Sequence, residues 1–164
     1  MIEVDIEVED EAWIDGGEEF QSSLTAAVQL ALDDEGSGAV TVLLTSNDVV
    51  RNLNHQFRGK DTPTNVLSFP AAPTASPHLG DIALAYGVCA AEAREQGKTL
   101  ERHVQHLVAH GALHLVGYDH QSEEDAIIME NKERTIMAQL GAPDPYQVRA
   151  EPAPSEIEKS HGDI

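Results

Sequence analysis

Cysteine is nearly absent from the sequence, because Cys89 is the single one in 164 residues. It has no partner within the chain, so disulfide bonds contribute nothing to stability and a reducing compartment is permitted. Cys89 lies in an apolar stretch with helical spacing. We therefore expect a small buried hydrophobic residue rather than a reactive thiol.

Long apolar runs are also missing. No stretch of about 18 apolar residues occurs, so a membrane-spanning helix is not expected. The first five residues, Met-Ile-Glu-Val-Asp, lack the basic start and the apolar run of a signal peptide. We therefore expect a cytoplasmic protein without a membrane partner.

Positive charge is scarce. Ten lysine and arginine residues stand against 29 aspartate and glutamate residues, which gives a formal net charge of −19 at pH 7. A protein that binds nucleic acid over its whole surface normally has a basic excess, so this class of binding is excluded. Any contact with RNA must be local, built from a few basic side chains and a metal ion. We expect such binding to be weak, salt-sensitive or assisted by a partner.

The chain does contain enough apolar material for one core. A chain of 164 residues with 41% hydrophobic and 24% charged residues is typical of one globular domain, which buries roughly two thirds of its unfolded surface. No internal repeat is evident. Residues from about 149 onward are rich in Pro, Glu and Ser. We therefore expect a single domain over 1–148 and a disordered acidic tail over 149–164.

Hydrophobic periodicity predicts intermixed strands and helices. Residues 2–8 alternate apolar and acidic side chains, which predicts a half-exposed strand. Residues 18–34 carry apolar side chains at helical spacing, and Gly36-Ser-Gly38 ends this pattern. By the same criteria we expect strands at 39–45, 65–69 and 81–86, with loops at 59–64 and 71–78. We expect further helices from the capping residues 46–48 to about 57, at 88–96, at 100–116, and from the capping box at 122–125 to 141.

Three histidines at the end of the predicted 100–116 helix form the main candidate site. His110 and His114 are four residues apart, so both imidazoles lie on one helix face and can bind one ion. Gly117 can adopt the positive φ that ends the helix and returns His120 toward the same point. Three neutral imidazoles leave one position of a tetrahedral zinc open, as in catalytic sites. Zinc lowers the pKa of a water ligand from 15.7 to about 7, so hydrolysis is the natural chemistry.

The spacing of these histidines is more specific than a chance pair on a helix. The pattern H-x3-H-x2-G-x2-H is the ligand framework of metzincin proteases. Those proteases place a glutamate next to the first histidine as general base, whereas this chain has Gly111 there. The pattern therefore favours a metal-dependent hydrolase other than a peptidase, such as one that acts on an RNA phosphodiester.

Two residues near the histidines have open roles. His106 is four residues before His110, so it could pair with it as a ligand, line a pocket or make a structural hydrogen bond. Asp119 could orient a ligand imidazole, as carboxylates often do, or could be a solvated turn residue.

Two segments resemble the motifs of the YbeY family of bacterial endoribonucleases. Residues 110–120 fit the signature H-G-x-L-H-L-x-G-Y-D-H at every specified position. Residues 53–70 are similar to the second hallmark through Leu53-Asn54, Phe57-Arg58 and the run TPTNVLSFP at 62–70, in which Asp or Asn occupies position 65. Residues 80–82 and 141–146 also fit, so the resemblance spans roughly residues 2–147.

This resemblance implies an α+β fold with a small mixed β-sheet of about four strands, about five helices and a central metal-bearing helix. It implies a zinc-dependent, single-strand-specific endoribonuclease with one Zn²⁺ ion, acting in ribosomal RNA 3′-end maturation and ribosome quality control. Its partners would be single-stranded RNA, ribosomal RNA in particular, and the ribosome or ribosome-associated proteins. The sequence does not indicate an oligomeric state.

The resemblance also assigns site residues. Arg58 matches the family's functional arginine, which would bind or polarise a phosphate near the metal. The resulting expectation is Arg58 and His114 as catalytic residues, Arg58 and Lys60 as substrate-binding residues, and His110, His114 and His120 as metal ligands.

Other residues of the matched motifs have simpler expected roles. Phe57 could stack a splayed base, but core packing is the simpler interpretation. Ser68 and Asp81 are expected to be structural.

Several functional alternatives stay open at this point. The nucleophile could be water or the ribose 2′-hydroxyl, and only the latter leaves a cyclic phosphate. A ribosome-assembly factor with a mainly structural zinc is an alternative that the acidic charge favours, because it suits a protein partner. A zinc hydrolase of peptides or small molecules is another, and the missing glutamate counts against it.

Overall fold

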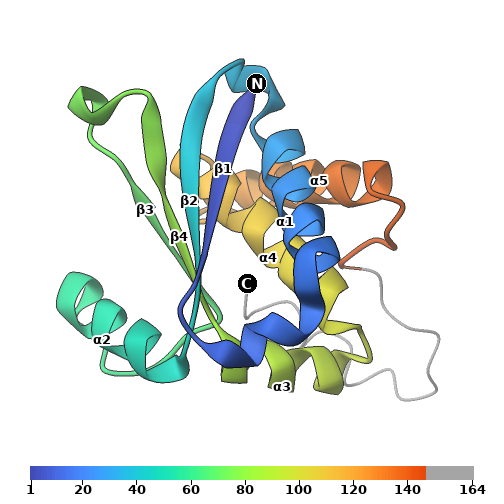
Figure 1. Cartoon of the computed structure of the whole chain (residues 1–164). Coiled ribbons are helices and arrows are strands. Elements are labelled where there is room, and N and C mark those ends of the chain that lie inside the picture. Colours follow the sequence, from blue (N-terminus) through green and yellow to red (C-terminus); the bar gives the residue numbers. More distant parts are fainter. Residues whose placement is uncertain (147–164) are drawn as a thin grey trace.

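The computed structural model describes residues 1–146, which contain a four-stranded sheet and five α-helices (Figure 1). This confirms the expected α+β fold with a mixed sheet. The expected tail at 149–164 and the end of the expected domain at 147–148 lie outside the described residues. The strands are β1 (Ile2–Val8), β2 (Gly38–Thr45), β3 (Val66–Pro70) and β4 (His78–Ala85).

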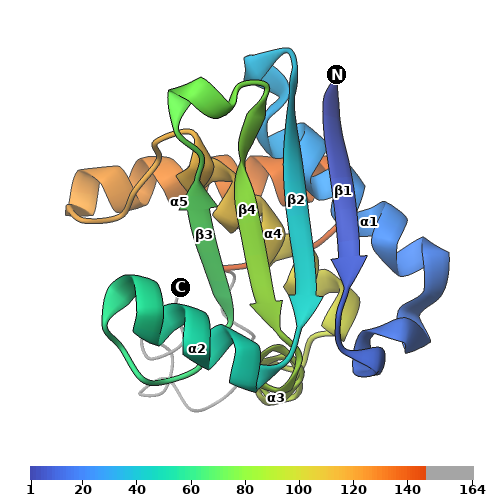
Figure 2. The same cartoon turned by 60° about the vertical axis from the view of Figure 1, so that its left-hand side comes forward.

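The sheet has the strand order β1-β2-β4-β3, with β3 at one edge (Figure 2). Strands β1, β2 and β4 are parallel, and β3 is antiparallel to β4. Apolar residues are paired in register across the centre, for example Val42 with Ile82 and Leu44 with Leu84, and all four are fully buried. β-branched and other apolar side chains suit such buried pairs, which explains why these segments form the sheet.

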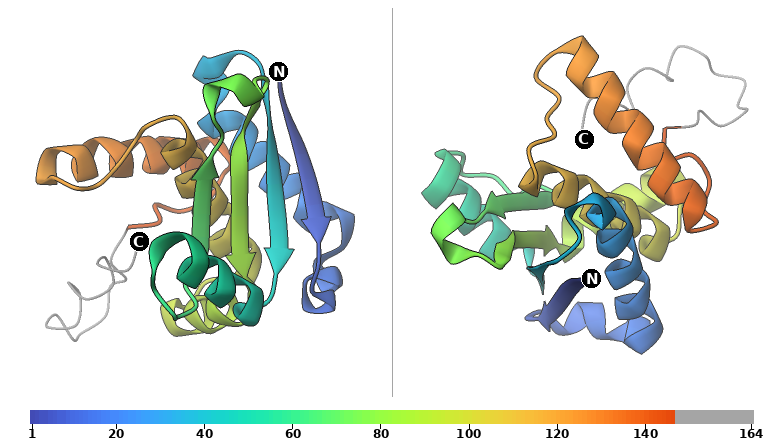
Figure 3. Two further views of the ribbon diagram at one scale, coloured as in Figure 1. Left: turned by 90° about the vertical axis from the view of Figure 1, so that its left-hand side faces the viewer. Right: turned by 90° about the horizontal axis from the view of Figure 1, so that it is seen from above.

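Helices cover both faces of the sheet. Figures 1 and 3 show α1 (Gly17–Ala31), α4 (Leu100–Leu115) and α5 (Glu123–Gln139) on one side and α2 (Asn47–Arg58) on the other. The remaining elements are α3 (Tyr86–Gln96) and the short 3-10 helices η1 (Glu11–Gly16), η2 (Asp33–Glu35) and η3 (Pro73–Ala75).

Helix α4 is the central helix of the larger core. Every residue from His103 to Leu113 is buried, so this helix is covered on all sides. A buried helix must pair its polar side chains inside the protein, and α4 carries three buried histidines in this range. Their partners decide the structure of the candidate site.

Helix ends follow the expected capping residues. Ser46 Oγ accepts from the Val49 N–H at 3.2 Å, and Ser122 Oγ accepts from the Asp125 N–H at 3.0 Å. Gly117 has a φ of 104°, which confirms the predicted positive φ after α4.

Two element boundaries differ from the expectation by three residues. β4 begins at His78 rather than at residue 81, because this segment pairs on both sides, with Ala39 of β2 and, through Gly80, with Pro70 of β3. The helix expected over 18–34 ends at Ala31 and is followed by η2. Pairing with neighbouring strands overrides the turn preference of a short local sequence.

Two expectations from missing features can be compared with the structure. Cys89 is buried, and burial raises the pKa of its thiol, which confirms an unreactive core residue. Among residues 1–146, the helices are all too short or too polar to cross a bilayer.

Candidate metal centre

The three histidines predicted as metal ligands lie together at the C-terminal end of α4. His110 and His114 are one turn apart on the helix, and His120 lies in the connection to α5. One ring nitrogen from each lies within 4.8 Å of the others. His110 Nε2 and His114 Nε2 are 3.1 Å apart. The helical period and the turn at Gly117 therefore bring together residues that the sequence separates by up to ten positions.

This cluster fits a single metal ion. Ligand nitrogens at about 2.0–2.1 Å from a tetrahedral zinc lie roughly 3.3 Å from each other, close to the spacing of His110 and His114. Among residues 1–146, the cluster includes no fourth histidine, cysteine or carboxylate. His110 is buried, His114 half-buried and His120 exposed, so one side of the cluster faces solvent. Such a set suits an ion with an open coordination position.

The protonation of His114 suits metal binding. Burial, together with the neighbouring His110 and His120, lowers the pKa of His114 to about 4. The charge of Asp119 raises the pKa of His114, but by less than burial and the two histidines lower it. His114 is therefore neutral at physiological pH, which is the form that binds metals.

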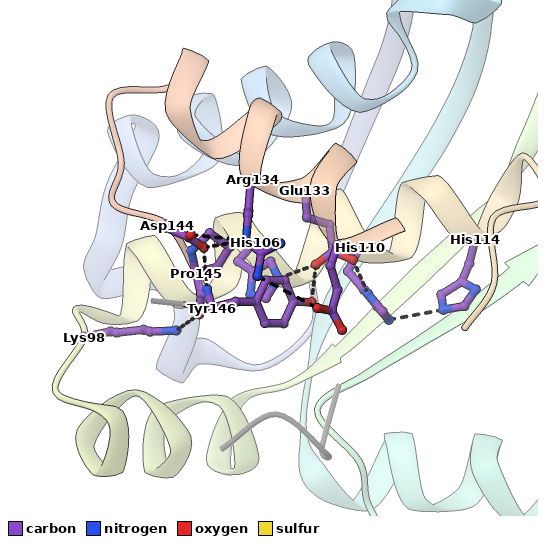
Figure 4. A network of polar contacts seen from close by, with 10 residues as sticks. Lys98, His106, His110, His114, Glu133, Arg134, Asp144, Pro145 and Tyr146 are labelled. Atoms are coloured by element: carbon purple, nitrogen blue, oxygen red, sulfur yellow. Dashed lines mark hydrogen bonds and ion pairs between the residues drawn. The ribbon is translucent and has the colours of Figure 1, made fainter. Parts of the chain in front are cut away.

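Glu133 of α5 orients His110, the first candidate ligand, and sequence reasoning missed it. Its carboxylate is fully buried, and Oε2 lies 3.0 Å from His110 Nδ1 (Figure 4). Burial alone would raise the pKa of Glu133, but hydrogen bonds with His106 and His110 hold it well below its ordinary value. An ionised carboxylate only accepts, so His110 Nδ1–H donates and the Nε2 lone pair faces His114.

A signal for Glu133 was present in the sequence. It lies on the apolar stripe of α5 between the buried residues Met129, Ile136 and Met137. A charged residue at such a position is rarely left unpaired in a core. The sequence does not say which residue is its partner, because that depends on how α5 packs against α4.

Two more side chains complete this buried network. His106 Nε2 hydrogen-bonds to Glu133 Oε1, and the Tyr146 hydroxyl donates to the same oxygen at 2.6 Å. Tyr146 is held by Asp144 Oδ1, which accepts from its backbone N–H at 2.8 Å, and by the Arg134 guanidinium over its ring at 5.3 Å. The segment after α5 therefore closes over Glu133 (Figure 4).

The residues with open roles are now placed. His106 lies outside the three-histidine cluster and has a structural hydrogen bond instead. Burial lowers the pKa of His106, so it is a neutral donor to Glu133. Asp119 Oδ1 accepts from the His120 N–H at 2.7 Å and so shapes the turn that carries the third candidate ligand.

Gly111 brings α4 close to the sheet. A Cβ at this position would lie 2.9 Å from Ser68 Oγ and 3.1 Å from Ile82 Cγ2. Ser68 Oγ also donates to the Gly111 carbonyl at 3.1 Å. Position 111 therefore faces the sheet and has no room for the glutamate of metzincin proteases, which explains the glycine.

Replacing Gly111 by alanine should destabilise the protein. Overpacking costs about 1–3 kcal/mol and the helix preference of alanine returns about 1 kcal/mol, so we expect a net loss of about 1 kcal/mol in the free energy of unfolding. Urea denaturation measures this loss. Ser68→Ala in the same chain should recover part of it by removing the hydroxyl. Unchanged or higher stability of Gly111→Ala would contradict the close contact.

The two predicted basic residues lie at the end of α2. Arg58 Nη2 donates to the Ser68 carbonyl at 2.9 Å, and the side chain of Arg58 is otherwise exposed. Lys60 is exposed and follows Gly59, the C-cap of α2. Through Ser68, Arg58 is connected to Gly111, the residue after His110. Asp81 pairs with His78 at 3.1 Å on the surface.

A pocket of about 170 Å³ adjoins the histidines. Its lining includes His110, His120, Glu130, Glu133 and Tyr146. The two carboxylates make it negative, which favours a cation and repels a phosphate until a cation is bound. The pocket and the open side of the cluster are therefore suited to an ion that then receives an anionic substrate.

Comparisons with known proteins agree on one family. The family model described as Endoribonuclease YbeY matches residues 5–141. A relative from Rhodopseudomonas palustris called Endoribonuclease YbeY is 50% identical over 136 residues, covering 77% of this chain and 72% of the relative. Another with this name, from Maricaulis maris, is 46% identical over 148 residues, covering 89% and 92%. The solution structure of TM1509 from Thermotoga maritima is similar with a TM-score of 0.51 and 29% identity, covering 90% of this chain and 99% of that one.

Proposed function

The chain belongs to the YbeY family of endoribonucleases, and we propose that it cleaves single-stranded RNA with a zinc ion held by His110, His114 and His120. The observation that carries this proposal is the open-sided cluster of three imidazoles at the end of α4. The family name supplies RNA as the substrate class. The proposed biological role is ribosomal RNA 3′-end maturation and ribosome quality control.

Zinc is the proposed ion because it prefers three or four nitrogen or sulfur ligands at this spacing. When bound, it supplies Lewis-acid polarisation and makes a nucleophile available at neutral pH. The chain's own part is to hold the imidazoles in place, with His114 neutral and Glu133 fixing the tautomer of His110. Either water or the ribose 2′-hydroxyl is compatible with this arrangement.

Arg58 is the proposed catalytic contact to the scissile phosphate, with Lys60 as a further substrate contact. The hydrogen bond to the Ser68 carbonyl holds the Arg58 guanidinium at the free edge of β3. Figure 2 shows the C-terminal end of α2 and the connection from α4 to α5 on the same side, beside this edge. The remaining guanidinium N–H groups are available to a phosphate and would offset charge that develops on it.

Arg58→Ala should lower the rate of RNA cleavage by about 100-fold or more while zinc stays bound, because it removes a charge-stabilising donor but no metal ligand. The measurement is cleavage of single-stranded RNA, paired with metal analysis of the same sample. Arg58→Lys should recover only part of the rate, since lysine lacks the planar fork.

Arg51→Ala is the matched control. Arg51 lies on the same helix and pairs with Asp61 in an exposed ion pair, which is worth little. We expect cleavage near the wild-type rate. Wild-type cleavage by Arg58→Ala would remove Arg58 from the mechanism.

The alternatives receive less support. A mainly structural zinc normally has four protein ligands, whereas this cluster contains three among residues 1–146. A peptidase of the metzincin type needs a carboxylate beside the first histidine, and position 111 is packed against the sheet. Both observations favour a nuclease.

The remaining expectations belong to the same proposal. We propose residues 1–148 as one metal-hydrolase domain, which the shared core of β1, α1, α4 and α5 supports. We also propose a cytoplasmic location and contacts with the ribosome or ribosome-associated proteins, for which a net charge of −19 favours protein surfaces over RNA.

A further inference from the structure

Phe57 is exposed, which corrects the expectation that it packs in the core. It lies in the last turn of α2, and 60% of its surface is accessible. Among residues 1–146 it is the single aromatic residue in the group of exposed large hydrophobic side chains. A ring of this size gains free energy from burial, so its exposure is unusual in a chain with few aromatics.

Phe57 is part of a small group of side chains at the edge of the sheet. Its ring meets the Phe69 ring edge-on at a centroid distance of 5.3 Å and an angle of 62°. The Arg58 guanidinium lies 6.0 Å from the centroid of the Phe69 ring. We call Phe57, Arg58 and Phe69 the aromatic edge. Phe69 contacts one edge of the Phe57 ring and leaves much of the ring exposed to solvent.

The aromatic edge connects to the metal centre through β3. The Ser68 carbonyl accepts from Arg58, while the Ser68 hydroxyl donates to Gly111, which follows His110. β3 is an edge strand, so nothing in the sheet lies beyond it on this side. Because Phe57 and Arg58 both lie against the Phe69 ring, an RNA that places a phosphate at Arg58 has the exposed ring of Phe57 nearby.

We propose that the aromatic edge is a stacking site for an unpaired base of the RNA substrate, next to the phosphate that Arg58 contacts. This inference rests on the proposed function and adds a reason for single-strand specificity, because a base inside a duplex has no free face to offer. Stacking on an aromatic ring is tolerant of base identity. Arg58 lies against the Phe69 ring and Lys60 follows two residues later, and both are among the ten Lys and Arg residues of an acidic chain, which favours a nucleotide over an apolar protein segment.

The test is a cycle that removes either the ring or the base. Wild type and Phe57→Ala are compared on a short single-stranded RNA and on the same RNA with one abasic residue, moved through the positions around the cleaved bond. Removing the base at one position should raise the KM of wild type roughly tenfold, as expected for loss of one stacked base. Phe57→Ala should show this higher KM on intact RNA and no further change at that position. Phe57→Tyr should behave as wild type.

Two controls separate this inference from the proposed function. Ile14→Ala removes an equally exposed apolar side chain from η1 and should leave KM unchanged. Binding of a 2′-O-methyl oligonucleotide, followed by fluorescence anisotropy, reports the stacking site without cleavage. Phe57-dependent binding without any cleavage would refute the nuclease and keep the stacking site. If Phe57→Ala has the same KM and the same affinity as wild type at every abasic position, the stacking site is overturned. The ring would then be left as a contact for a protein.

Discussion

His114→Ala should abolish both metal binding and RNA cleavage while the protein stays folded. With two imidazoles left, the ion loses the ligand that lies 3.1 Å from His110 Nε2. Without the ion neither possible nucleophile is activated, so the rate should fall to about a thousandth of the wild-type value or lower. Because His114 is half-buried at the end of α4 and alanine favours helices, the cost in stability should be small. Metal analysis, circular dichroism and cleavage of single-stranded RNA measure the three effects.

The control for His114→Ala is His78→Ala. His78 lies at the start of β4, outside the three-histidine cluster, and pairs with Asp81 on the surface, so metal content and cleavage should be unchanged. If His114→Ala unfolds, His120→Ala replaces it, because His120 is exposed in a turn. A folded, metal-free variant that still supports ribosomal RNA maturation would contradict the enzymatic proposal and favour an assembly factor.

Glu133→Gln should weaken zinc binding by about 10–100-fold and also destabilise the protein. The carboxylate accepts from three donors, on His106, His110 and Tyr146. An amide of the same size offers one oxygen and turns its N–H₂ toward a donor, which leaves buried polar groups unpaired. Each such group costs about 1–3 kcal/mol, so the free energy of unfolding should fall by at least this amount. Zinc titration and urea denaturation separate the two effects.

Glu124→Gln removes the same charge from the same helix without touching the network. Glu124 is exposed in the first turn of α5, so zinc affinity and stability should both stay near wild type. The tautomer of His110 is a further readout, because NMR of the ring nitrogens should show Nδ1–H in wild type and a mixture in Glu133→Gln. Unchanged zinc affinity in a folded Glu133→Gln would show that Glu133 supports the fold without orienting the ligand.

The local hydrophobic pattern predicted an element correctly where the boundaries of that element did not depend on pairing with other strands. The alternation in residues 2–8 and the helix at 100–116 were correctly predicted, because each reflects one exposed and one buried face or a simple helical period. The start of β4 was predicted too late. Residues 78–80 follow Pro77 and end with Gly80, and only their partners in β2 and β3 make them a strand.

The grouping of the three histidines depended almost wholly on local backbone geometry. His110, His114 and His120 belong to one helix and the turn that follows it, so the 3.6-residue period and the positive φ of Gly117 were enough to bring them together. The motif at 110–120, which contains these histidines, and the motif at 53–70 then identified the family.

The support of that cluster was decided by tertiary structure. Glu133 meets His110 across 23 positions of sequence, and the Ser68 hydroxyl meets Gly111 across 43. The sequence suggested that Phe57 packs in the core, but the position of α2 at the free edge of β3 leaves its ring exposed. Spacing within a helix is fixed by backbone geometry that every sequence shares, whereas contacts between elements depend on how the whole chain packs. For this reason the sequence by itself determined which histidines come together, and only the folded protein determined what orients His110 and what lies beside the cluster.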